Sequence, residues 1–197
     1  MASSVKPPAE TKVASQPSLR HSDPAPPLDP ALRETLAQEL YKRYKLSRLR
    51  MAANNEAEIS ALKESDASFH ESWNDLADHL KQSTRSQADD VPRKLQLIGY
   101  SLAKADAAAA AGKQTLDAFS EEQLEFLGEV EHDRWVAERM KSGWQAAAGR
   151  DSTAQKTPFF VPYADLEQKW KDVDKDMVRC VPEVLAKAGY RIYRVKE

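Results

Sequence analysis

The stretch "WNDLADHLKQSTRSQADDVPRKLQLIGY", residues 73–100, decides the fold because a second version of it follows 90 residues later. Residues 163–190 read "YADLEQKWKDVDKDMVRCVPEVLAKAGY", and eight of the 28 positions are identical without a gap. Both versions keep the order D-L, K, V-P-x-x-L-x-x-x-G-Y. We interpret this agreement as an internal duplication, which predicts two similar structural units in one chain.

Each version carries signals for helices followed by a short strand. Pro92 and Pro182 lie within helical patterns, where a proline must start or kink a helix. Gly99 and Gly189 stand where a helix would end in a left-handed cap. The "RIYRV" at residues 191–195 has the β-branched and aromatic alternation of a short strand.

A helix precedes each version. Asp29 is a suitable N-cap before Pro30, and leucines follow at helical spacing. Ser120 and Gln123 have the spacing of a capping box, so a long amphipathic helix should run from there to about Ser142. The glycine that follows marks its end.

These two helices also correspond, at a shift of 91 residues. Tyr44 then falls on Trp135, and Arg48 falls on Arg139. An aromatic residue and an arginine four positions later are neighbours on one helix face. Taken singly, the rings are readily explained as core and the arginines as solvated. If the two units face each other, both pairs converge on one cleft, and rings with guanidiniums suit a nucleotide.

Composition limits the classes of function. The formal net charge of −2 gives no field to attract nucleic acid or an anionic membrane. No apolar run approaches the roughly 18 residues of a membrane span, and the first thirty residues lack a secretory core. With a single cysteine, Cys180, a reducing compartment is the natural interpretation. We therefore expect a soluble, cytoplasmic protein.

The chain divides into four parts. Residues 1–28 hold six of the eleven prolines and few large apolar side chains, which predicts a disordered, proline-rich tail. The first unit is expected at 29–105 and the second at 120–197. Residues 106–119 form an alanine-rich linker between them.

No catalytic or metal constellation is evident. His132 has no histidine or cysteine partner at ligand spacing, and no serine or cysteine nucleophile accompanies it. The GxxxxGK[ST] spacing of a phosphate loop is absent. We therefore expect a protein that is not an enzyme, binds no metal and requires no cofactor. Cys180 is expected in the core, as are three large aromatic residues, namely Tyr163, Trp144 and Trp170.

The motifs resemble a known family. "EVEHDRWVAERMKSGW", "FFVPYADL" and "VPEVLAKAGY" resemble the repeated RyR domain, named for the ryanodine receptor and also found in bacterial proteins. Residues 73–100 resemble the other half of the bacterial tandem form. The resemblance implies an α+β, mainly helical fold with short antiparallel strands, whose tandem repeats are related by a pseudo-twofold axis. It also implies an adenine nucleotide held between the halves.

Site residues follow from the same resemblance. The stacking ring falls on Trp135, with Tyr44 in the other half, and the phosphate-side arginine falls on Arg139, with Arg48 as its counterpart. The polar positions that open the late helices fall on Thr84, Arg85, Asp174 and Lys175. His132, three residues before Trp135, completes the candidate set. Here Asp174 replaces an asparagine, and the first half lacks the Gly143-Trp144 pair.

Two functions remain open at this point. The first is a non-enzymatic sensor that binds an adenine-nucleotide-like small molecule between the repeats, as in ligand-sensing or signalling modules. The alternative is a protein–protein interaction or scaffold module of a multi-protein system, in signalling or defence. The proline-rich tail fits the second role, because such segments dock in grooves or tether domains.

Overall fold

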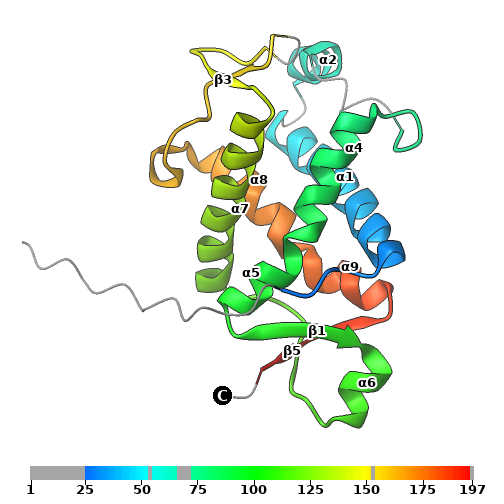
Figure 1. The fold of residues 1–197 in the computed structure, drawn as a ribbon. Helices are drawn as coiled ribbons and strands as arrows, with labels where there is room; N and C mark the ends of the chain where they lie inside the picture. The colour runs from blue at the N-terminus through cyan, green and yellow to red at the C-terminus, as the bar shows by residue number, and fades with distance from the viewer. Residues whose placement is uncertain (1–24, 53–54, 66–71, 152–153, 196–197) are drawn as a thin grey trace, which may run out of the picture.

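The computed structural model describes residues 25–52, 55–65, 72–151 and 154–195, and it is mainly helical with a few short strands (Figure 1). Of the expected tail, residues 1–24 lie outside these ranges, whereas Leu28 packs against the core. Across the described ranges, no helix has both the length and the apolar character needed to cross a membrane.

The two longest helices begin at the caps that the sequence predicts. At α1 (Pro30–Ala52), Asp29 Oδ1 accepts hydrogen bonds from two N–H groups of the first turn, at 3.0 and 3.2 Å. At α7 (Glu121–Lys141), the Gln123 N–H donates to Ser120 Oγ at 3.2 Å, and the Ser120 N–H donates to Gln123 Oε1 at 3.0 Å. Both caps satisfy N–H groups that the helix itself leaves unpaired, so these predictions are confirmed.

The two similar stretches fold into the same series of helix, short helix and strand. The first series is α4 (Asp78–Asp89), α5 (Val91–Leu97) and β1 (Tyr100–Lys104). The second is α8 (Gln168–Arg179), α9 (Val181–Lys187) and β5 (Tyr190–Arg194), and each bound lies 90 residues after its counterpart. Pro92 and Pro182 sit in the first turn of the short helices, which they start and do not kink. Gly99 and Gly189 both have φ of +80°, the predicted left-handed caps.

Side-chain contacts also recur at corresponding positions. A lysine reaches back to a carbonyl that precedes its own helix, from Lys81 to Asn74 at 2.9 Å and from Lys171 to Ala164 at 3.0 Å. A basic residue of the helix pairs with a glutamate of the long helix, Arg85 with Glu34 at 2.8 Å and Lys175 with Glu125 at 3.1 Å. The two series therefore share contacts as well as lengths.

A three-stranded antiparallel sheet lies at one end of the helices, with β5 between β1 and β2 (Thr115–Leu116) (Figure 1). Leu102 in the middle of β1 lies opposite Ile192 in β5, which stands 90 residues later in the chain. The β5 strand was expected, but β1 was not. The region expected as a linker is also structured, because it contains α6 (Ala105–Ala110), where Ala108 is buried, as well as β2.

In Figure 1, α2 and β3 lie towards the other end of the helices. The polar stretch after α1 contains α2 (Glu56–Ser65). A turn-like segment holds β3 (Gln145–Ala146) and β4 (Lys156–Thr157), which pair in parallel where antiparallel strands were expected. The 3₁₀ turn η1 (Tyr163–Asp165) leads into α8.

The main core joins elements of both halves beside the sheet. Its largest fully buried side chains are Leu36, Leu40, Leu95, Val184, Leu185 and Ile192. Cys180 belongs to the same cluster and is buried, as predicted. Because this core fills the sheet end of the molecule, the farther turns of α1, α4, α7 and α8 are left to enclose other space.

Candidate ligand-binding site

A cavity of about 410 Å³ lies between α1, α4, α7 and α8, and Trp144, Arg150, Gln155 and Phe159 also line it. This volume is within the range of roughly 300–1,000 Å³ that small-molecule sites occupy. Aromatic rings form much of the wall, namely Tyr41, Tyr44, Trp135, Trp144, Phe159 and Trp170. The cavity is therefore suited to a ligand with a planar, stackable part.

Helix α1 supplies one ring and one arginine. Tyr44 and Arg48 are four residues apart, so they share a helix face. Arg48 Nη1 donates to the Tyr44 hydroxyl at 2.6 Å, and the guanidinium lies 5.1 Å from the centre of the Trp170 ring. Although it carries a charge, the Arg48 residue is only 6% exposed. The contacts with the Tyr44 hydroxyl and the Trp170 ring hold Arg48 in the wall of the cavity.

Helix α7 supplies the corresponding pair and a second ring. The Arg139 guanidinium lies 5.8 Å from the Trp135 ring centre and 4.8 Å from that of Trp144. Gly143 has φ of +85°, which reverses the chain, and the Trp144 N–H donates to the Arg139 carbonyl at 3.0 Å. This left-handed helix end brings the indole back beside the arginine.

Arg139 is a buried cation whose needs are not fully met. Its Nε is buried without a hydrogen-bond partner, and within the described part of the chain no carboxylate forms an ion pair with it. Burial lowers the pKa of the guanidinium below its usual value. An unpaired buried donor costs about 1–3 kcal/mol, and more when charged. An anionic ligand group beside Arg139 would remove that cost.

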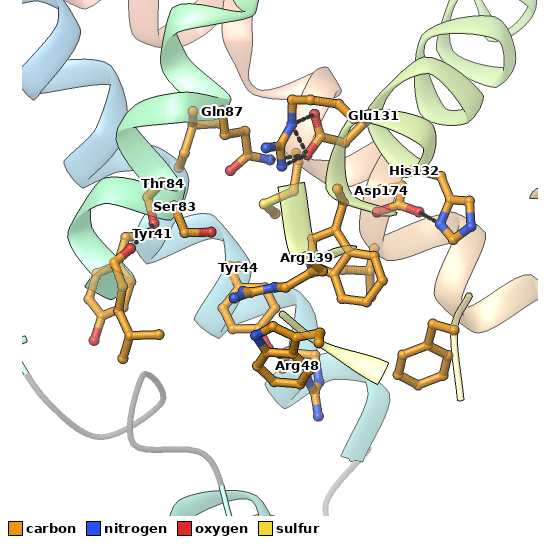
Figure 2. Close-up of a pocket in the computed structure, with 18 of the residues that line it drawn as sticks. Tyr41, Tyr44, Arg48, Ser83, Thr84, Gln87, Glu131, His132, Arg139 and Asp174 are labelled. Carbon is orange, nitrogen blue, oxygen red and sulfur yellow. Dashed lines mark hydrogen bonds and ion pairs between the residues drawn. The ribbon is translucent and has the colours of Figure 1, made fainter. Parts of the chain in front are cut away.

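The opposite corner of the cavity is polar and tightly paired. Glu131 is 2% exposed and accepts hydrogen bonds from Lys94 at 2.6 Å, Arg134 at 2.7 Å and Gln87 at 2.8 Å. Burial alone would raise the pKa of Glu131, but Arg134 and Lys94 hold it down at about 2. Because the carboxylate only accepts, Gln87 must turn its amide nitrogen towards it, as Figure 2 shows. The Gln87 carbonyl oxygen is left as an acceptor.

A histidine and an aspartate form a third polar group. His132 Nδ1 lies 3.4 Å from Asp174 Oδ2 (Figure 2). The His132 Nε2 lies 2.8 Å from the Val161 carbonyl oxygen. Burial raises the pKa of Asp174 to about 6, although the hydrogen bond with His132 acts against this. The pKa of His132 is raised, because Asp174 and the Val161 carbonyl outweigh its burial.

Comparison with known families adds one finding. Residues 111–194 match the model of the RyR domain. The chain contains an RyR domain. The matched range includes α7, α8, α9 and β5, so it supplies Trp135, Arg139, His132 and Asp174 to the cavity.

Seven of the nine predicted site residues line the cavity, some from the RyR domain and some from the preceding helices. They are Tyr44, Arg48, Thr84, His132, Trp135, Arg139 and Asp174. Arg85 and Lys175 are not part of the lining, because they pair with Glu34 and Glu125 elsewhere. Thr84 and Asp174 lie inside α4 and α8 and do not open these helices, so Asp174 is no helix cap. The Thr84 hydroxyl donates to the Leu80 carbonyl at 3.3 Å.

Some lining residues were not predicted as site residues from the sequence. Trp144 and Trp170 were expected in the core, but both are partly exposed and line the cavity, whereas Tyr163 is buried as predicted. Gln87 and Glu131 were not singled out at all. Gln87 follows Thr84 by three residues and so shares its helix face, a signal that could have identified it. Among the described residues, no group of three His, Cys, Asp or Glu side chains is placed to hold a metal ion.

Proposed function

We propose that the protein is a tandem RyR module that binds an adenine-nucleotide-like small molecule between its two halves without turning it over. The first unit, residues 29–105, is then a diverged second copy related to the RyR domain by a pseudo-twofold axis. One observation carries the proposal, namely that both ring-and-arginine pairs line the same cavity.

The duplication is supported by the way in which the halves join. In an antiparallel pair of equivalent strands, a local twofold axis requires equivalent residues to face each other. Leu102 and Ile192 satisfy this condition, because they are 90 residues apart and opposite in the sheet. The equal element lengths and the recurring lysine-to-carbonyl contacts are consistent with the same origin.

A purine base suits the aromatic wall. Stacking of a base on an aromatic ring contributes about 1–3 kcal/mol, and several partly exposed rings line the cavity. The Gln87 carbonyl oxygen is an acceptor to which the exocyclic amine of adenine can donate. Its orientation is fixed by the bond from the Gln87 amide to Glu131, so the acceptor is preorganised.

The state of His132 supports binding without catalysis. One ring nitrogen faces the Val161 carbonyl and the other faces Asp174. Both nitrogens are therefore engaged within the protein, and neither is presented to a ligand as a general base. The imidazole instead holds Asp174 in place on the cavity wall.

Isothermal titration calorimetry with AMP, ADP, ATP, ADP-ribose and cyclic AMP tests this function. We expect micromolar binding of at least one nucleotide, and we expect Trp135→Ala to weaken it at least about tenfold, because a stacking surface is lost. The matched control is Phe126→Ala, since Phe126 lies on the same helix but is 43% exposed and outside the lining.

Circular dichroism of each variant distinguishes a lost contact from a lost fold. A folded wild-type protein that binds none of the five nucleotides would contradict the proposed function. Equal affinities of wild type and a folded Trp135→Ala would place any nucleotide outside this cavity.

A further inference from the structure

The two arginines of the cavity differ in what satisfies them, because their partner rings differ. Tyr44 carries a hydroxyl that accepts a hydrogen bond from Arg48 at 2.6 Å. At the corresponding position Trp135 carries an indole, which has one N–H donor and no acceptor. Trp135 therefore cannot do for Arg139 what Tyr44 does for Arg48, and the Arg139 Nε stays buried without a partner.

The other charges of the lining do not favour a second anionic group. Arg134 is held between Glu131 at 2.7 Å and Glu138 at 3.0 Å. Arg150 is exposed, where water screens its charge. Two carboxylates, Glu131 and Asp174, also line the cavity. A chain of phosphates would thus meet one unsatisfied buried cation and two acidic side chains.

The volume of the cavity also favours a single anionic group. About 410 Å³ must accommodate the base, the sugar and the anionic part of a ligand. Any phosphate that extends past Arg139 towards the exposed residues exchanges one hydrated environment for another, which contributes little to affinity. The first phosphate therefore supplies the electrostatic part of the binding energy.

We propose, on the basis of the function above, that the ligand is a nucleoside carrying a single phosphate, which is bound by Arg139. Arg48 donates to the Tyr44 hydroxyl and so positions the Tyr44 ring, and it does not bind the phosphate. The bound ligand has one orientation, although the two halves offer similar ring-and-arginine pairs.

The test compares adenosine, AMP, ADP and ATP by calorimetry without divalent cations. We expect AMP to bind at least as tightly as ADP and ATP, and adenosine to bind roughly 10- to 100-fold more weakly than AMP, as one charge-assisted contact provides. ADP or ATP binding more than roughly threefold tighter than AMP would overturn the proposal.

Two variants separate the roles of the arginines. In Arg139→Gln, the affinity for AMP should fall to that for adenosine, whereas the affinity for adenosine should change little. In Arg48→Gln, the affinities for AMP and adenosine should fall together, so that their ratio is kept. The reverse pattern would overturn the assignment.

The outcomes also separate this proposal from the function on which it rests. If none of the four compounds binds the folded protein, the proposed function fails and this inference fails with it. If adenosine and AMP bind equally well to the wild type, nucleoside binding stands and the phosphate site at Arg139 is wrong.

Discussion

Asp174 holds a proton at pH values where an exposed aspartate would have lost it. Burial raises its pKa from 3.8 to about 6, although its hydrogen bond to His132 lowers it. The pKa of His132 lies above the usual histidine value of 6.5, because Asp174 and a backbone carbonyl outweigh its burial. Two neighbouring groups that bind protons more tightly in the folded state make folding depend on pH.

The first prediction concerns the stability of the protein between pH 3 and 8. The contribution of Asp174 is full below pH 3.8 and is lost as the pH rises through about 6, and that of His132 is lost as the pH rises above 6.5. Glu131 acts in the opposite sense, since its pKa of about 2 gives stability above pH 4.5 that is lost in acid. The free energy of unfolding should therefore peak near pH 5. Its alkaline fall should be on the order of 1–3 kcal/mol.

Urea denaturation followed by circular dichroism measures this profile, and one substitution with a matched control tests the cause of its alkaline fall. Asp174→Asn should flatten the fall between pH 5 and 7, because the titrating carboxyl and its effect on His132 are both removed. Asp172→Asn is the matched control, since Asp172 is an exposed carboxylate of the same helix. An unchanged slope in Asp174→Asn would show that other groups cause the pH dependence.

At the scale of single elements, capping makes the most direct prediction. The capping box at the start of α7 satisfies two N–H groups, and its Ser120 hydroxyl accepts one of these hydrogen bonds. Replacement of an N-cap serine by alanine costs about 0.5–2 kcal/mol. Ser120→Ala should therefore lower the free energy of unfolding by about 1 kcal/mol, as measured by thermal or urea denaturation.

The control for this substitution lies at the other end of the same helix. Ser142 is the C-cap residue, and its side chain forms no hydrogen bond within the described residues. Ser142→Ala should leave the stability within about 0.5 kcal/mol of the wild type. Equal losses from both substitutions would mean that the capping hydrogen bonds contribute nothing of their own.

Elements with local signals were predictable from the sequence, and elements that depend on distant partners were not. The caps of α1 and α7, the proline starts of α5 and α9, and the β5 strand all have signatures within a few residues. The "YSLAK" of β1 has no strong strand signature, and its conformation depends on pairing with β5. The alanine-rich segment after it gains order from the same sheet.

The site divides in the same way. The four-residue spacing of each ring and arginine predicted a shared helix face, and both pairs line the cavity. Arg85 and Lys175 lie outside the lining because consecutive residues of a helix point about 100° apart, and it is Thr84 and Asp174 that face the cavity. Trp144 could not be placed, since its position depends on the chain reversal at Gly143.

At the scale of the whole molecule, the two halves depend on each other. Glu131 of the second half accepts hydrogen bonds from Lys94 and Gln87 of the first. The central strand β5 pairs with β1 on one side and β2 on the other. The main core contains leucines of α1 together with residues of α9 and β5. Each half therefore buries part of its apolar surface against the other.

This interdependence predicts how fragments behave. Residues 106–197, which include the whole of the matched RyR range, would expose Val184, Leu185 and Ile192 to water, each now 1% exposed or less. Burial of such a side chain contributes about 1.5–3 kcal/mol. Three of them together are therefore comparable with a typical total stability of about 5–15 kcal/mol. The separate fragment should lack a cooperative thermal transition by circular dichroism, and the full chain should unfold in one. Mixing it with residues 25–105 should restore helicity, because the same core forms between the pieces. A cooperative transition in the fragment alone would show instead that the second half has a self-sufficient core, with the cavity as a contact between independent domains.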